Sequence, residues 1–173
     1  MNYYDSLLTD LLDSTGCKIE WESGIGVDIL PMAIAPDHQF RMLLAVSGDC
    51  PFELPTGMER VSPVYLLLPQ FDFQYLIKLS LEHWAHIPSQ SSCDDLVVLS
   101  TRAVPVHIMG GKFIDAETHE PIVGEEVYGT FHFNSPKVFI TVSHFSWWCV
   151  FRRYVGIGKC AFLSFAVVVT VIL

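Results

Sequence analysis

The sequence predicts an all-β protein, an antiparallel β-sandwich of about eight or more strands with a short N-terminal helix. From Cys17 onward, short apolar or alternating stretches recur between turn residues, and the ten prolines fall almost wholly between these stretches. With 51% hydrophobic and 17% charged residues, the 173-residue chain has the composition of a folded domain with a real core. We expect residues 1–15 to form the helix, 16–154 the sandwich domain and 155–173 an apolar tail.

The N-terminal helix is predicted from leucines at helical spacing. They are Leu7, Leu8, Leu11 and Leu12, and Gly16 follows as a stop signal. The same segment lacks the basic and apolar regions of a secretory signal, so a cytoplasmic location is the default expectation.

Eight stretches are expected to be strands because they are apolar or alternating and are bounded by Gly, Pro, Asn or Asp. They are residues 18–21, 26–30, 40–47, 64–68, 76–81, 96–101, 127–133 and 137–151. If the last stretch is one strand, His144 and Ser146 share a face and lie about 7 Å apart, too far for a direct hydrogen bond unless the backbone bends.

Composition and spacing argue against several kinds of site. The formal net charge is -9 and only ten residues are Lys or Arg, which argues against a nucleic-acid partner. The five cysteines are odd in number and form no CxxC, so neither a disulfide framework nor a zinc site is indicated. His83 and His86 would lie on opposite faces of a strand, and Gly24 and Gly26 lack the rest of a dinucleotide fingerprint. We therefore expect no cofactor and no metal.

The last fourteen residues, CAFLSFAVVVTVIL (160–173), carry no charge and follow a basic stretch. A helix of this length spans about 21 Å, less than the roughly 30 Å of a hydrocarbon core. The segment is open to three interpretations: a C-terminal membrane anchor with its basic flank on the cytosolic side, an additional strand, or a truncated end of the reading frame.

Three segments of the chain resemble a known family in order along the sequence. They are SGIGVDILPMAI, RVSPVYLLLPQFDFQYLIKLSLEHWA and VFITVSHFSWWCVF. They are similar to the opening, centre and closing strands of the ZU-five domain, named for zona occludens and the uncoordinated-five netrin receptors and also found in ankyrins. The sequence departs from that pattern at Met32, where glycine is common, and at Glu82, where proline is usual. The resemblance implies a β-sandwich that binds protein partners in intracellular signalling or membrane-skeleton scaffolding.

The closing segment also resembles a self-cleavage site. His144, Phe145 and Ser146, followed by an aromatic residue, are similar to the site of the PIDDosome death-domain adaptor and of the function-to-find domains, which break the chain between Phe and Ser. The resemblance implies that Ser146 attacks the carbonyl of Phe145, with His144 as the first candidate base and His119 and His132 as alternatives. Two functions stay open: an intact interaction module, which we place first, and a self-cleaving domain; no turnover enzyme is expected.

Overall fold

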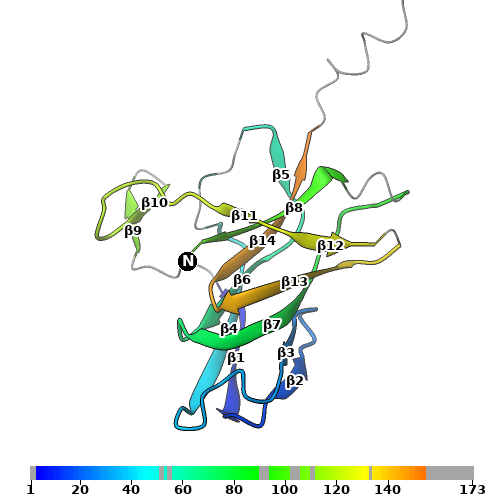
Figure 1. Cartoon of the computed structure of the whole chain (residues 1–173). Helices are drawn as coiled ribbons and strands as arrows, with labels where there is room; N and C mark the ends of the chain where they lie inside the picture. Colours follow the sequence, from blue (N-terminus) through cyan, green and yellow to red (C-terminus); the bar gives the residue numbers. More distant parts are fainter. Residues whose placement is uncertain are drawn as a thin grey trace, which may run out of the picture.

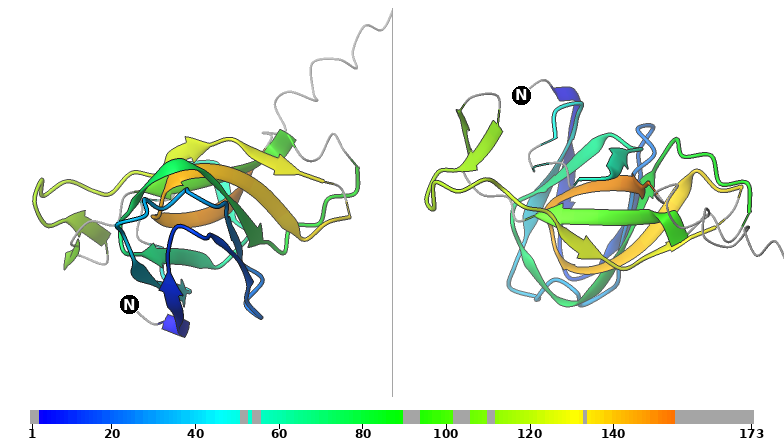
Figure 2. Two further views of the ribbon diagram at one scale, coloured as in Figure 1. Left: turned by 60° about the horizontal axis from the view of Figure 1, so that its bottom comes forward. Right: turned by 90° about the horizontal axis from the view of Figure 1, so that it is seen from above.

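A computed structural model describes residues 3–50, 53, 56–89, 94–101, 106–109, 112–132 and 134–154. Two antiparallel sheets pack against each other in this part of the chain, and a two-stranded hairpin stands apart from them (Figures 1 and 2). The prediction of an all-β sandwich is confirmed.

The first sheet has seven strands in the order β1-β4-β6-β14-β8-β11, and β5 pairs with β14 off this path. Its strands are β1 (Tyr3–Leu12), β4 (Phe40–Ser47), β5 (Met58–Arg60), β6 (Val64–Leu68), β8 (Leu96–Thr101), β11 (Glu125–Val127) and β14 (Trp147–Arg153). The predicted strands 40–47, 64–68 and 96–101 have the same bounds as β4, β6 and β8.

The second sheet has five strands in the order β12-β13-β7-β3-β2. Its strands are β2 (Cys17–Glu20), β3 (Gly26–Ile29), β7 (Asp72–Glu82), β12 (Gly129–Phe131) and β13 (Lys137–His144). The separate hairpin is β9 (Val106–Met109) paired with β10 (Lys112–Asp115).

The N-terminal helix predicted for residues 1–15 is wrong. Residues 3–12 form β1, the edge strand beside β4, with Leu12 opposite Phe40. The pairing slips between Leu8 and Leu11, where the Thr9 hydroxyl accepts a hydrogen bond from the Met42 amide at 2.9 Å. The two leucine pairs recur four residues apart, a spacing that also suits a helix, and pairing with β4 decides between the two structures.

Two predicted strands are each divided between the sheets. The predicted strand 137–151 becomes β13, which pairs with β7 in the second sheet, and β14, which pairs with β6 and β8 in the first. The predicted strand 127–133 likewise becomes the end of β11 and all of β12, which belong to different sheets. A straight strand of fifteen residues would be roughly 50 Å long, far more than a typical strand, which favours a change of sheet.

The main core lies between the two sheets, and a second apolar cluster covers the other face of the first sheet. In β14, Trp148 and Val150 belong to the main core, whereas Trp147, Cys149 and Phe151 belong to the second cluster. Because both of its faces are buried, β14 reads as a continuous apolar run instead of an alternating one.

The described residues contain no helix that is long and apolar enough to cross a membrane. The predicted tail, including the candidate anchor 160–173, lies outside the described residues.

Candidate functional site

The candidate cleavage bond lies where the chain passes from the second sheet to the first. His144 ends β13 opposite Asp72, and Trp147 begins β14 opposite Leu66. Only Phe145 and Ser146 lie between the two strands, and both have 0% exposed surface. We call these two residues the buried crossing. The chain therefore changes sheet between His144 and Trp147.

Phe145 is fixed in a cluster of aromatic rings. Its ring meets Phe73 edge-on with centroids 4.9 Å apart and Phe40 edge-on at 6.2 Å. Phe71 stacks in turn on Phe40 at 4.6 Å. Edge-to-face pairs of this kind stabilise beyond their buried area, so the residue before the candidate bond is held tightly.

The Ser146 hydroxyl is fully engaged with β8. It donates a hydrogen bond to the main-chain carbonyl of Thr101, and it accepts one from the Ser100 hydroxyl at 3.3 Å. The Ser146 carbonyl accepts from the Leu67 amide at 3.0 Å. In the described structure, neither of the two groups that hydrogen-bond to the Ser146 hydroxyl is an imidazole. The one that accepts its proton in the hydrogen bond is a main-chain carbonyl, which cannot act as a general base. This is the arrangement of a buried serine with satisfied hydrogen bonds.

His144 precedes Phe145, and in the described structure its side-chain contacts are with Ser143 and Trp148 instead of Ser146. Its Nδ1 is 3.3 Å from the Ser143 hydroxyl, and its ring centroid is 6.2 Å from that of Trp148. His144 nevertheless lines the same pocket as Ser100 and Thr101, the two residues that hold Ser146. The structure thus places this candidate base near the candidate nucleophile without joining them by a hydrogen bond.

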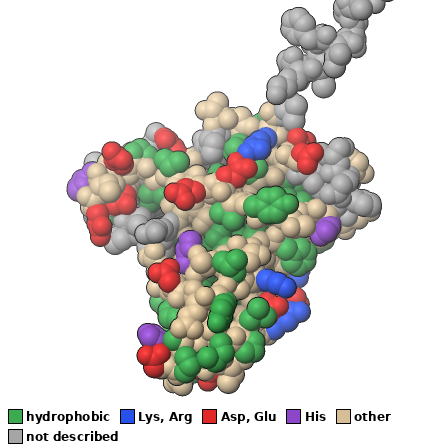
Figure 3. All heavy atoms as spheres, viewed as in Figure 1, with side chains coloured by type: hydrophobic (Ala, Val, Ile, Leu, Met, Phe, Trp, Pro, Cys, Tyr) green, Lys and Arg blue, Asp and Glu red, His purple; other side chains and the backbone are tan. Residues whose placement is uncertain are grey.

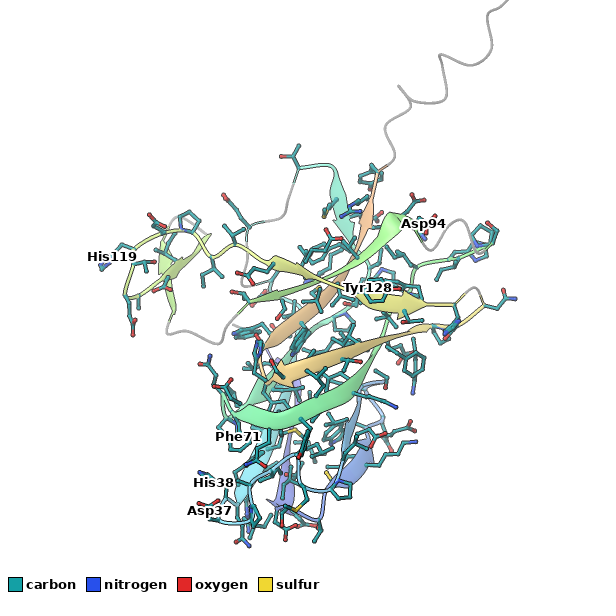
Figure 4. The ribbon with its side chains drawn as sticks, in the orientation of Figure 1. Asp37, His38, Phe71, Asp94, His119 and Tyr128 are labelled. Atoms are coloured by element: carbon teal, nitrogen blue, oxygen red, sulfur yellow. The ribbon has the colours of Figure 1, made fainter. Side chains whose placement is uncertain are left out.

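The two alternative bases lie away from Ser146. His119 closes the turn after β10 with a left-handed backbone (φ 62°) and an exposed side chain, at the outer end of its loop (Figure 4). His132 follows β12, and its ring lies 6.4 Å from Phe139. Since β12 pairs with the start of β13, His132 is about 20 Å of strand away from His144.

A cleft of about 630 Å³ opens between the two sheets beside the buried crossing. Its walls come from β8, β11 and Trp148 of the first sheet, from β7 and β13 of the second, and from the segment 115–123. We call it the inter-sheet cleft. It carries the carboxylates of Asp115, Glu120 and Glu125, and its described lining has no Lys or Arg.

Asp115 holds one wall of the inter-sheet cleft in shape. Its carboxylate accepts hydrogen bonds from the amides of Glu117 at 2.7 Å and Thr118 at 3.0 Å. These bonds, first that from Thr118, lower the pKa of Asp115 below its usual value. The carboxylate is therefore negative at neutral pH. Sequence reasoning missed this cleft, although the absence of Lys and Arg from residues 113–136, which hold five acids, was a signal for it.

The two histidines of the HWAH motif do not converge. His83 is 3% exposed, and neither ring nitrogen has a hydrogen-bond partner in the described structure. Burial, and then the charge of Arg152, lower the pKa of His83. His86 is exposed, and its carbonyl accepts a hydrogen bond from Arg152 at 2.6 Å. No group of three His, Cys, Asp or Glu side chains suited to a metal ion occurs in the described ranges.

The three cysteines that the structure describes also form no ligand set for a metal ion. Cys149 is buried in β14, where desolvation raises the pKa of its thiol, and Cys17 and Cys50 are half-buried. Cys93 and Cys160 lie outside the described residues.

Compared with models of known protein families and with curated proteins, the chain matches none of them.

Proposed function

We propose that the chain is a protein-protein interaction module of intracellular signalling or membrane-skeleton scaffolding. The observation that carries this proposal is a set of exposed aromatic side chains on and beside the second sheet: Tyr75, Trp84, Tyr128 and Phe139. Tyr128 is 89% exposed and projects at the front of the sandwich between β11 and β12 (Figure 4). Aromatic residues are enriched at the centres of protein interfaces, where they contribute much of the binding energy.

The resemblance to ZU-five domains supports the same proposal independently, because it rests on the sequence and not on the exposed surface. In such a module the sandwich is a rigid support, and binding depends on side chains at its surface. Burial of one large apolar side chain contributes about 1.5–3 kcal/mol. Loss of two aromatic contacts should therefore lower the affinity for a partner by more than about tenfold.

The test is quantitative affinity capture from cell extract with the full chain as bait. We expect Tyr128→Asp combined with Phe139→Asp to lose the partner that the unmodified chain retains. Leu11→Asp is the matched control, because Leu11 is also exposed but lies in β1 at the far edge of the first sheet. The proposal is overturned if the captured proteins are the same for both variants.

Self-cleavage at the Phe145–Ser146 bond is the second candidate, and one observation favours it. The bond lies between two strands that are each hydrogen-bonded into a different sheet. A break there would leave both fragments held in the sandwich. The strand pairing of β13 and of β14 would keep the two fragments together without the peptide bond between them.

The reaction would follow an N-to-O acyl shift. Ser146 Oγ attacks the carbonyl carbon of Phe145, the bond to the Ser146 nitrogen breaks, and the hydroxyl proton passes to that nitrogen through a base. Water then hydrolyses the ester, which leaves a Phe145 carboxylate and a free amine and hydroxyl on Ser146. Before attack, the hydroxyl must release the Thr101 carbonyl, and His144 must turn away from Ser143.

Intact mass measurement and denaturing electrophoresis of fresh protein decide this candidate. Cleavage would give two fragments whose masses sum to the chain plus one water. Ser146→Ala would abolish the cut, His144→Ala would slow it, and His86→Ala serves as the control because His86 is exposed and outside the cleft. A single full-length species that Ser146→Ala leaves unchanged would remove self-cleavage.

A further inference from the structure

Two cysteines far apart in the sequence lie side by side in the second apolar cluster, on the face of the first sheet turned away from the main core. Cys149 belongs to this cluster and has 0% exposed surface, and the half-buried Cys50 packs against it from the loop that follows β4. A hydrogen bond joins the two thiols. We call Cys50 and Cys149 the thiol pair.

Neighbouring strands fix the surroundings of the thiol pair. The sulfur of Cys149 lies 3.5 Å from the Ser62 hydroxyl, between β5 and β6. Arg60, at the end of β5, donates a hydrogen bond to the carbonyl of Gly48, two residues before Cys50. The guanidinium therefore lies beside the loop of Cys50, and its positive charge also acts on Cys149.

The two thiols differ in how readily they meet a reagent from solution. Burial, and then the hydrogen bond with Cys50, raise the pKa of the Cys149 thiol well above its usual value. The thiolate is the form that attacks a disulfide, so Cys149 is slow to react, although the charge of Arg60 opposes the shift. Cys50 is half-buried and therefore meets an oxidant first, with Cys149 beside it as the second thiol.

The geometry of the fold favours this pair over a bond to the other described cysteine. Two sulfurs in hydrogen-bonding contact reach the S–S distance of about 2.05 Å by small side-chain rotations, and Cys50 lies in a loop, where the backbone can adjust. Cys17 packs against the main core from β2, so the first sheet lies between it and Cys149.

We propose that the thiol pair is a redox modification site, at which Cys50 and Cys149 form a reversible disulfide with glutathione disulfide as the oxidant. The Cys50 thiolate attacks one sulfur of glutathione disulfide, whose S–S bond breaks and releases one glutathione. The Cys149 thiolate then attacks the Cys50 sulfur of the mixed disulfide and releases the second glutathione. Two protein thiols lose two electrons and two protons, and both are taken up by the two glutathione thiols. Excess reduced glutathione reverses the steps.

The disulfide would fasten the loop after β4 to a central strand of the first sheet. Glu53, three residues beyond Cys50, donates its amide to the carbonyl of Ile122 at 3.0 Å, and Ile122 is buried in the second apolar cluster. The loop thus lies along this cluster, and the new bond would tie it to Cys149 of β14. Disulfides in reducing compartments are usually transient and report the redox state, which fits a reversible bond at this place.

This inference does not depend on the proposed interaction function. The aromatic side chains of that proposal lie on and beside the second sheet, on the face whose hydrophobic side chains Figure 3 shows. The thiol pair lies in the second apolar cluster of the first sheet. Loss of partner capture and loss of the disulfide are therefore separate results.

The first test locates the disulfide by peptide mapping. The folded full chain is incubated with glutathione disulfide, quenched in acid, blocked with N-ethylmaleimide in guanidinium chloride and digested with trypsin without reduction. Trypsin places each of the five cysteines in a peptide of its own, with Cys50 in residues 42–60 and Cys149 in residues 138–152. We expect these two peptides to be linked, and the link to disappear after treatment with excess reduced glutathione. The inference is overturned if both peptides carry the maleimide, or if either is linked mainly to a different peptide.

The second test uses variants to separate the roles of the two thiols. Cys50→Ser should leave residues 138–152 unmodified by glutathione in the folded chain, because Cys149 is buried. Cys149→Ala should stop at the mixed disulfide and keep glutathione on residues 42–60. Cys17→Ser is the matched control and should still form the link. A Cys50→Ser chain with glutathione on residues 138–152 would contradict the order of the steps, and Cys50→Ser gives this result even if Cys149→Ala does not fold.

The third test asks whether the bond forms within the folded sandwich. Urea denaturation should show an unfolding equilibrium constant at least about tenfold smaller for the oxidised chain than for the reduced one, because the disulfide closes a long loop of the unfolded chain. The difference should vanish in Cys50→Ser and persist in Cys17→Ser. Equal denaturation of the oxidised and reduced chains would show that the bond does not fasten the folded structure and would overturn the inference.

Discussion

The chain passes between the two sheets at two places that are built differently. From β13 to β14 it passes through the buried crossing, Phe145 and Ser146, which have 0% exposed surface. From β11 to β12 it passes through Tyr128, which is 89% exposed at the edge of the sandwich. We call Tyr128 and Gly129 the surface crossing. The chain can therefore change sheet either through residues that are buried in the core or through residues at the surface.

The two crossings are held in place by different interactions. The buried crossing depends on ring packing around Phe145 and on the hydrogen bonds of Ser146. The surface crossing depends on lack of space, because a Cβ on Gly129 would lie 2.8 Å from Val138 Cγ2 and 3.2 Å from Val98 Cγ2. Val98 belongs to the first sheet and Val138 to the second, so Gly129 fits where the sheets come together. The difference predicts how each crossing responds to substitution.

The largest expected effect is the loss of the Phe145 ring. Phe145→Ala should lower the free energy of unfolding by about 3–5 kcal/mol, because it removes a fully buried ring and leaves a cavity beside Phe40 and Phe73. Urea denaturation measures the change. A loss below about 1 kcal/mol would mean that the aromatic cluster does not fix this crossing.

A methyl group at the surface crossing should have a smaller effect. Gly129→Ala is expected to cost about 1–3 kcal/mol, because the short, stiff side chain of Val138 cannot move far from the new Cβ. A double-mutant cycle with Val138→Ala checks the cause. The two losses should sum to more than the loss in the double variant, and strict additivity would show that the methyl group does not meet Val138.

The pH dependence of stability should reveal His83, whose ring lies 5.9 Å from Phe131 at the end of β12. Burial, then Arg152, lower its pKa in the folded state below the value of an exposed histidine, 6.5. The unfolded chain therefore takes up a proton first as the pH falls, and the contribution of neutral His83 to stability is present above pH 6.5 and declines as the pH falls toward the folded pKa.

Urea midpoints between pH 7.5 and pH 5 measure this decline, and His83→Phe should make it shallower. His86→Phe is the matched control, because His86 is exposed and its substitution should leave the slope unchanged. The assignment to His83 is wrong if both variants decline like the unmodified chain.

Several strands that stay in one sheet could be predicted from the sequence, and the crossings could not. Alternation and turn residues give β4, β6 and β8 their bounds, because those signals are local. Residues 137–151 read as one strand, since apolar periodicity reports burial but not which sheet a residue joins. The leucine pairs of β1 fit a helix equally well, and only the distant β4 decides. Contact between Ser146 and Thr101 spans forty-five positions, so no local pattern reveals it.

Tyr128 should give the smallest effect on stability and the clearest one on function. Tyr128→Ser removes an exposed ring that supports no described neighbour in the core, so the free energy of unfolding should change by no more than about 0.5 kcal/mol. If the surface crossing is a binding surface, the same substitution should still reduce partner capture by about tenfold. Denaturation and capture are measured on one preparation.

Phe145→Ala should show the opposite pattern at temperatures where it stays folded, because its side chain lies wholly inside the sandwich and cannot touch a partner. A Tyr128→Ser protein that loses stability, or that captures its partner undiminished, would remove the distinction between a crossing built for packing and one available for binding.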